Sequence, residues 1–145
     1  MTTLLKTNNE KETIKLGEKI GVLLKKGDIV SLIGELGVGK TYLTKGIVKG
    51  MGLDSDVKSP TFMIINEYKG ILNVYHFDCY RIKNFKELER LGYEEYFYGD
   101  GVTIIEWADK IRELLPANCI NITMRKKNKN QRLIQIKNLR QEFYK

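Results

Sequence analysis

The first residues with an evident chemistry form a glycine-rich run that fits G-x-x-x-x-G-K-[ST]. Its three glycines allow the backbone to close around phosphate oxygens, with N–H groups pointing inward at the positive end of a following helix. Lys40 supplies a point charge for β- and γ-phosphate oxygens, and the Thr41 hydroxyl can bind Mg²⁺. The run therefore predicts a phosphate-binding loop (P-loop). The expected nucleotide contacts in and after it are Gly34, Glu35, Leu36, Gly37, Val38, Gly39, Lys40, Thr41 and Tyr42.

Two carboxylates follow strand-like segments, where a P-loop protein needs an acid to hold its magnesium ion. Asp78 ends the segment Ile71–Phe77, and Glu106 ends Val102–Ile105, which is the cleaner apolar run. Either acid alone could be a surface charge at a strand end. Because the loop requires such a group, we expect both acids in the site.

The segments around these residues alternate between strand and helix patterns. A short apolar strand runs directly into the glycine-rich loop, and a helix follows it, so the loop has the context that its chemistry needs. The pattern predicts one α/β domain over residues 1–145, P-loop NTPase-like, with a mostly parallel central sheet, an antiparallel portion and helices on both faces. The expected helices are 9–26, Thr41–Met51, Asn84–Leu91, Ala108–Leu115 and a short terminal one. The expected strands are Ile29–Ile33, Phe62–Tyr68, Ile71–Phe77, Val102–Ile105, Cys119–Met124 and Leu133–Ile136.

Composition is that of a globular protein rather than a membrane or exported one. The chain has 145 residues, 42% of them hydrophobic, and no apolar run approaches the roughly 20 residues of a membrane span. The N-terminal segment turns polar too quickly for a secretion signal, so a cytoplasmic location is expected. Cys79 and Cys119 form no metal-binding pattern and are expected to be buried thiols.

The net charge of +7 lies entirely in the last 21 residues. Residues 125–145 hold eight basic and one acidic side chain, whereas residues 1–124 hold seventeen of each. One interpretation is a solvated basic end that aids solubility. The other is an anion-facing edge that meets nucleotide phosphates, RNA or an acidic partner. The sequence leaves both open.

Beyond the loop, three further motifs give the chain a specific resemblance. SPTF stands at Ser59–Phe62, YHFDCYR at Tyr75–Arg81 and EWAD at Glu106–Asp109. Together with GELGVGKT at Gly34–Thr41, in this order and spacing, they resemble the TsaE (YjeE) family of bacterial tRNA threonylcarbamoyladenosine biosynthesis. The resemblance covers nearly the whole chain.

This resemblance implies an ATPase, slow alone, that assists the partners TsaB and TsaD. TsaD transfers a threonylcarbamoyl group to the adenosine beside the tRNA anticodon, so contact with tRNA would be indirect, through the complex. By resemblance, Thr41 and Glu106 hold Mg²⁺, with Asp78 as the second acid near the metal. Ser59–Phe62 would sense the nucleotide, with the Thr61 hydroxyl presented towards the γ-phosphate. Lys40, Asp78, Glu106 and Thr61 are then the expected catalytic residues.

The resemblance also suggests residues at the far end of the nucleotide. The family places a basic residue between the last strands, and Arg132 matches best, with Arg125 as its rival. Glu10 corresponds to a residue beside the adenine, although an acid in the first turn of a helix is an equal interpretation. Trp107 is expected beside the site or in the core, and His76 in a structural role.

Other classes of function remain open from the residues themselves. A GTPase would need an N-K-x-D motif, but residues 128–131 read NKNQ, without the carboxylate that selects guanine. A small-molecule kinase shares the P-loop but also needs an acceptor pocket and a lid. No segment of the sequence has a recognisable signal for either. An RNA-binding module would rest on the basic end alone.

Overall fold

The computed structural model describes residues 2–35, 37–53 and 65–144. The segment SPTF, the proposed sensor Thr61, the loop residue Leu36 and the first part of the expected strand Phe62–Tyr68 lie outside these residues. In chain order the elements are β1 (Thr2–Thr7), α1 (Glu10–Leu23), β2 (Ile29–Ile33), α2 (Lys40–Gly50), β3 (Ile65–Tyr68), β4 (Val74–Asp78), α3 (Lys86–Arg90), α4 (Tyr93–Phe97), β5 (Val102–Glu106), the 3₁₀ helix η1 (Ala108–Leu114), β6 (Ile120–Lys126), β7 (Arg132–Lys137) and the 3₁₀ helix η2 (Gln141–Tyr144).

Seven strands form a single sheet in the order β1-β7-β6-β2-β5-β4-β3. The four central strands are parallel, since β2 pairs with β5 and β6, and β5 with β4. Antiparallel pairs close both edges, β3 against β4 and β1 and β6 against β7. The expected α/β sheet is confirmed. The glycine-rich loop follows β2, which is the middle strand of the sheet.

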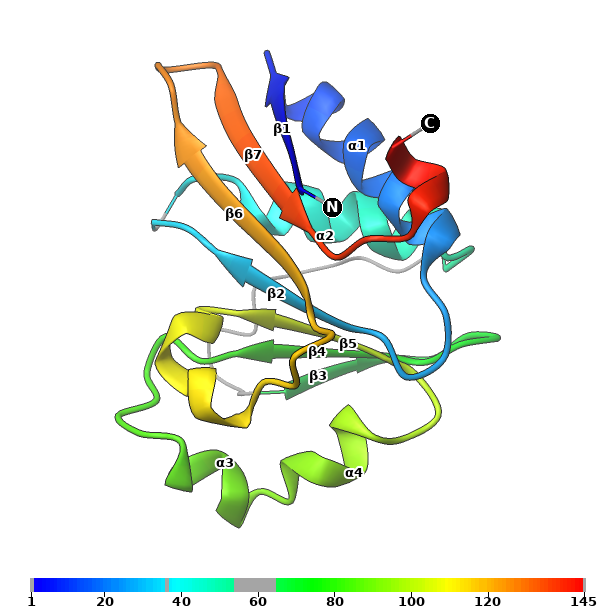
Figure 1. Cartoon of the computed structure of the whole chain (residues 1–145), viewed down its shortest axis with the longest axis vertical. Helices are drawn as coiled ribbons and strands as arrows, with labels where there is room; N and C mark the ends of the chain where they lie inside the picture. The colour runs from blue at the N-terminus through cyan, green and yellow to red at the C-terminus, as the bar shows by residue number, and fades with distance from the viewer. Residues whose placement is uncertain (1, 36, 54–64, 145) are drawn as a thin grey trace.

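Helices cover both faces of this sheet (Figure 1). On one face α1 and α2 pack over a cluster that includes Val30, Leu32 and Ile104. On the other, α3, α4 and η1 cover a second cluster that includes Phe77 and Ile105. The alternation of side chains along β4 and β5 therefore decides which residues reach the α2 side, where the loop lies.

The helices α1 and α2 approach each other closely through glycines. A Cβ atom at Gly46 would lie 2.0 Å from the Ile14 carbonyl oxygen, and one at Gly21 would lie 2.1 Å from that of Ile47. Gly17 and Gly50 face equally close backbone atoms across the same contact. These small residues let the two backbones touch, which seats α2, and with it Lys40, against the rest of the domain.

Several element boundaries differ from the sequence-based expectation. The first helix ends at Leu23 rather than 26, because the backbone N–H of Lys25 donates to Asp28 Oδ2 at 2.7 Å and Gly27 adopts a φ of 88°. The strand expected from Ile71 begins at Val74, after a turn in which Asn73 Oδ1 accepts from the N–H of Gly70. The helix expected over Ala108–Leu115 is a 3₁₀ helix that ends at Leu114.

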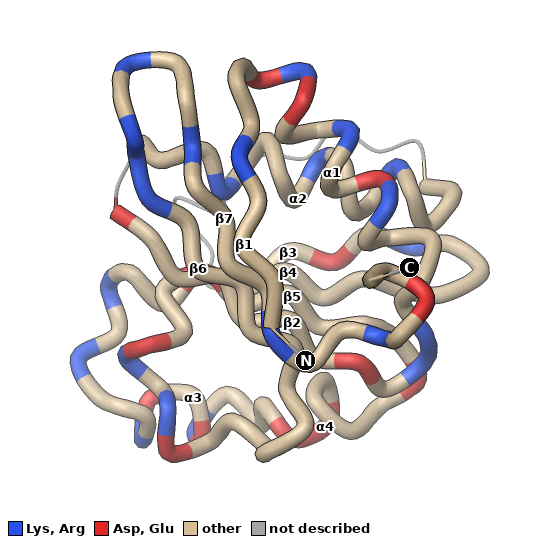
Figure 2. The backbone as a smooth tube through the Cα atoms, turned by 45° about the horizontal axis from the view of Figure 1, so that its top comes forward, with Lys and Arg blue, Asp and Glu red and all other residues tan. Residues whose placement is uncertain are grey.

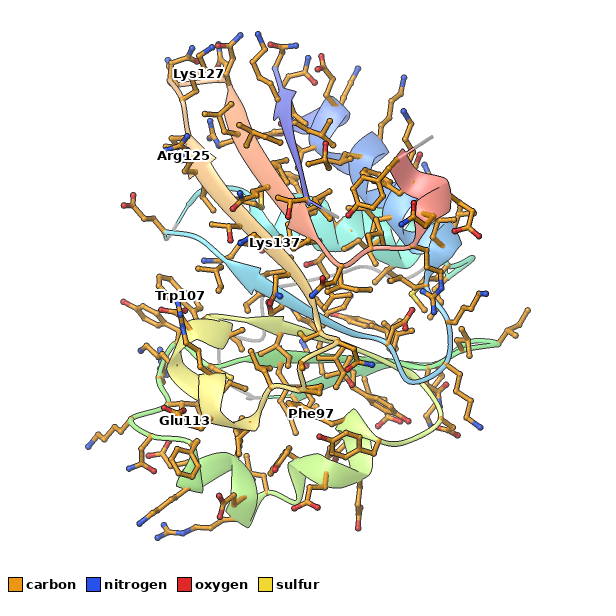
Figure 3. All side chains as sticks on the ribbon, in the orientation of Figure 1. Phe97, Trp107, Glu113, Arg125, Lys127 and Lys137 are labelled. Carbon is orange, nitrogen blue, oxygen red and sulfur yellow. The ribbon has the colours of Figure 1, made fainter. Side chains whose placement is uncertain are left out.

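Two elements were not expected from the sequence. Strand β1 has a mixed polar composition, and it pairs with β7 at the edge of the sheet. Helix α4 and the residue after it hold an aromatic cluster, Tyr93, Tyr96, Phe97 and Tyr98. Phe97 is buried and points from α4 towards the sheet (Figure 3), so most of this cluster is core, while Tyr98 is 63% exposed. Among the described helices, none has the length and apolar character needed to cross a membrane.

Candidate nucleotide-binding site

The loop between β2 and α2 has the conformation that its glycines permit. Gly37 and Gly39 have φ values of 77° and 108°, in the left-handed region that residues with a side chain avoid. A Cβ atom at Gly34 would lie 2.8 Å from the carbonyl oxygen of Met124 on β6. The loop therefore curls tightly against the sheet before α2 begins at Lys40.

Lys40 turns back into this curl. Its Nζ donates to the carbonyl oxygen of Gly34 and, at 3.4 Å, to that of Glu35, and it lies 3.9 Å from the ring centroid of Trp107. Burial lowers the pKa of Lys40, while the charges of Glu106, Asp78 and Asp109 act in the opposite direction. The charges of the acids at the strand ends therefore act on the Lys40 ammonium group.

Asp78 and Glu106 meet at the carboxyl ends of β4 and β5, where they are direct partners in the parallel register. Both lie on the α2 side of the sheet, since Val74 and Ile104 of the same strands do. Glu106 is buried and Asp78 is partly buried. Two adjacent carboxylates beside a buried lysine are thus brought together as the sequence predicted.

Trp107 closes this end of the site. Its φ of 59° is unusual for a residue with a side chain, and its backbone N–H donates to the Leu32 carbonyl oxygen at 3.1 Å. Figure 3 shows it at the end of β5. Trp107 thus lies beside Lys40, with its ring over the ammonium group, and also packs against the core on the other face of the sheet.

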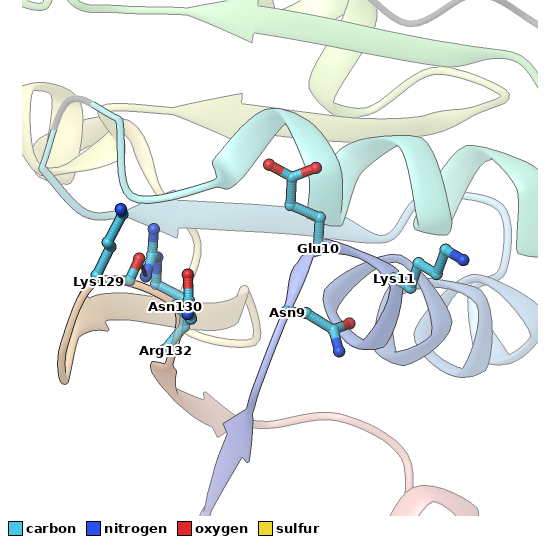
Figure 4. Close-up of a pocket in the computed structure, with 6 residues that line it drawn as sticks. All are labelled: Asn9, Glu10, Lys11, Lys129, Asn130 and Arg132. Atoms are coloured by element: carbon cyan, nitrogen blue, oxygen red, sulfur yellow. Dashed lines mark hydrogen bonds between the residues drawn. The ribbon is translucent and has the colours of Figure 1, made fainter.

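A cavity of about 490 Å³ opens at the other end of the loop, between the start of α1 and the β6–β7 hairpin (Figure 4). Arg132 Nε donates to the Val38 carbonyl oxygen at 2.8 Å, which ties the hairpin to the loop. The Glu10 carboxylate beside the Tyr42 hydroxyl raises the pKa of Tyr42. The lining residues are Asn9, Glu10, Lys11, Lys129, Asn130 and Arg132.

The two residues suggested for the far end of the nucleotide, Glu10 and Arg132, therefore share one cavity. The rival Arg125 is not among the lining residues. Sequence reasoning missed Asn9, Lys11, Lys129 and Asn130. For Lys129 and Asn130 the available signal was their place in the hairpin loop that leads to Arg132.

The donor set suits Mg²⁺ held jointly by the protein and a nucleotide. Within the described part of the chain, no group of three His, Cys, Asp or Glu residues could hold a metal ion. Thr41, Glu106 and Asp78 instead offer hard oxygen atoms at the loop and strand ends. Mg²⁺ is commonly bound in this way, by one or two carboxylates together with substrate phosphates and water.

The charged form of Asp78 destabilises the fold, and a substitution that removes the charge should show this effect. Its pKa is raised, first by burial and also by Glu106, against the opposing effects of the Tyr80 N–H and of Lys40. A raised folded-state pKa means that the charged form destabilises the fold at neutral pH, and that this cost disappears as the pH falls.

We therefore expect Asp78→Asn to raise Tm at pH 7, because the amide has no charge to desolvate. The gain over the unsubstituted protein should shrink as the pH is lowered towards about 4. Thermal unfolding at both pH values measures it. A variant that melts below the unsubstituted protein at pH 7 would contradict the assignment of a desolvated charge.

The fold and this arrangement define a P-loop NTPase-like protein: a glycine-rich loop joins a central parallel strand to a helix, beside two strand-end carboxylates. The family model described as "Threonylcarbamoyl adenosine biosynthesis protein TsaE" matches residues 7–134. The chain belongs to this family.

Individual relatives agree. The chain is 42% identical over 130 residues to the tRNA threonylcarbamoyladenosine biosynthesis protein TsaE of Bacillus subtilis (strain 168), covering 89% of this chain and 81% of that protein. It is 35% identical over 119 residues to the protein of the same name in Treponema pallidum (strain Nichols), covering 82% and 88%. The crystal structure of Bacillus subtilis YdiB superimposes with a TM-score of 0.84 at 34% identity, over 99% of this chain and 90% of that one.

Proposed function

We propose that this chain binds and hydrolyses ATP, with Mg²⁺, in support of threonylcarbamoyladenosine formation on tRNA, acting with TsaB and TsaD in the cytoplasm. The observation that carries the proposal is the placement of Lys40. Its ammonium group lies inside a glycine-rich loop and within the field of the two strand-end acids, Asp78 and Glu106. That combination recognises a phosphate chain and a hard cation together.

The loop would bind the phosphates, and the acids would bind the cation. Backbone N–H groups of the loop and the start of α2 bind the phosphates, and Lys40 stabilises the charge that develops on them. Thr41 and Glu106 would hold Mg²⁺, with Asp78 nearby. The bound cation would neutralise charge on the β- and γ-phosphate oxygens. Either Asp78 or Glu106 would orient the attacking water, and Asp78 is the more exposed of the two.

The cavity beside Glu10 and Arg132 is our candidate site for the nucleoside end of ATP. It adjoins the loop through the bond from Arg132 to the Val38 carbonyl oxygen. The nucleotide would then run from this cavity, along the loop, to Lys40. Thr61, the expected sensor of the γ-phosphate, stays a prediction from the resemblance.

The two acids should separate by experiment. Glu106→Gln should weaken nucleotide binding roughly tenfold or more in the presence of Mg²⁺, because it removes a metal ligand, and should lower activity in parallel. Asp78→Asn should lower turnover more than affinity. Titration of the nucleotide with and without Mg²⁺ measures both. Equal, magnesium-independent affinities in all three proteins would refute the metal role.

The basic residues supply a second property of the proposal, attraction to an anionic partner surface. Figure 2 shows Lys and Arg gathered on the β6–β7 hairpin. Arg125, Lys126, Lys127 and Lys129 are all exposed there. Association driven by such charges weakens as salt rises. This favours a docking role for the basic segment 125–145 in assembly with TsaB, TsaD or tRNA.

A further inference from the structure

His76 lies in the middle of β4, directly beneath the candidate metal site. It is fully buried, and in the sheet register it stands opposite Ile104 of β5. Because side chains alternate along a strand, His76 shares the α2 side of the sheet with Asp78 and Glu106. A buried imidazole is thus set one layer below the two acids.

One ring nitrogen of His76 is committed to Glu106. The distance from His76 Nε2 to Glu106 Oε2 is 2.6 Å, and both side chains are almost completely enclosed. A carboxylate only accepts hydrogen bonds, so Nε2 carries the proton in this pair. The bond engages one carboxylate oxygen and leaves Oε1 as the oxygen available to a cation.

The other ring nitrogen argues against a purely packing role. His76 Nδ1 is buried and has no hydrogen-bond partner among the described residues. A buried polar atom without a partner is unfavourable, and an apolar side chain of similar size would avoid that cost. The polar ring therefore has to be explained by what Nε2 does.

We propose that His76 is a positioning residue, which holds the Glu106 carboxylate in the orientation that binds Mg²⁺. Its hydrogen bond fixes the rotation of the carboxylate, so that Oε1 is presented towards the loop. Hydrogen-bonded partners of metal-binding carboxylates commonly act in this way, and their loss costs about 10- to 100-fold in metal affinity. The inference rests on the proposed Mg²⁺–ATP function.

The test compares two substitutions by their effect on metal coupling. His76→Leu removes the donor and keeps most of the volume, whereas His76→Gln can return an N–H near the position of Nε2. For each protein, the affinity for a fluorescent ATP analogue is measured in EDTA and over a Mg²⁺ titration. Mn²⁺ binding to the protein–nucleotide complex, followed by electron paramagnetic resonance, gives a readout that does not depend on turnover.

We expect His76→Leu to weaken Mg²⁺ and Mn²⁺ binding about 10- to 100-fold, with nucleotide affinity in EDTA changed by less than about twofold. His76→Gln should recover most of the metal affinity. Thr103→Val is the matched control, because Thr103 is also buried and polar on a central strand, but donates to the Tyr96 carbonyl oxygen. Its metal affinity should equal that of the unsubstituted protein, whatever its Tm.

Three results would overturn the inference. They are unchanged metal binding in a folded His76→Leu protein, an equal loss of nucleotide affinity with and without metal, and a loss that His76→Gln does not recover. Failure of the proposed function is distinguishable, because the unsubstituted protein would then bind the ATP analogue without any dependence on Mg²⁺.

Discussion

Replacing Lys40 by alanine is expected to lower ATP hydrolysis at least about a hundredfold, the usual order for a lost group that stabilises transition-state charge. The Lys40 ammonium group is held by loop carbonyls and covered by Trp107, at the point where the loop meets α2. The substitution removes a side chain at the first residue of α2. It leaves the glycines that shape the loop unchanged.

Lys49→Ala provides the matched control for this prediction. Lys49 lies on the same helix and carries the same charge, but its side chain is 72% exposed and pairs with Glu18 at the far end of α2. Hydrolysis by Lys49→Ala should match that of the unsubstituted protein. Phosphate release is the measurement, with circular dichroism to establish folding. Near-normal hydrolysis by a folded Lys40→Ala protein would exclude the glycine-rich loop with Lys40 as the site of hydrolysis.

Gly46→Ala is expected to cause a large loss of stability, because it adds a methyl group at the close contact between the helices α1 and α2. Its Cβ atom would lie 2.0 Å from the Ile14 carbonyl oxygen, and its nearest neighbours are backbone atoms, which cannot rotate away. Overpacking typically costs 1–3 kcal/mol, so we expect about 3 kcal/mol or more here. Since α2 begins with Lys40, nucleotide affinity should fall as well.

Gly27→Ala separates this clash from ordinary glycine effects. Gly27 has a φ of 88°, but nothing lies within 4 Å of an added Cβ atom, so only backbone strain of roughly 1–2 kcal/mol is expected. Urea unfolding of both variants gives the two free energies. If Gly46→Ala lowered the free energy of unfolding by no more than Gly27→Ala does, the close contact between the two helices would be contradicted.

The phosphate end of the candidate site could be predicted from the sequence because it is local. The loop residues are consecutive, and the two acids end strands that apolar runs reveal, so parallel pairing alone brings Asp78 beside Glu106. Strand β2 and helix α2 were found for the same reason. Their signals lie within a few residues of each other.

The other end of the site depends on contacts between distant segments. Arg132 reaches Val38 only because β7 pairs antiparallel with β6, and Glu10 joins Arg132 at one cavity only because α1 starts beside the hairpin. Strand β1 was missed because its six residues show little apolar periodicity and its partner lies at the opposite end of the chain. The pair His76–Glu106 needs the exact register of β4 and β5.

The most direct test of the account is phosphate release from ATP by this protein alone, with TsaB–TsaD, and with the same complex plus tRNA. The account predicts slow hydrolysis alone and a clear increase with the partners, since a group supplied by another molecule can contribute about 10³–10⁵ in rate. The increase should diminish as salt rises, because the exposed lysines and arginines of the β6–β7 hairpin assist association. An unchanged rate in all three mixtures, at low salt and with binding established, would contradict it.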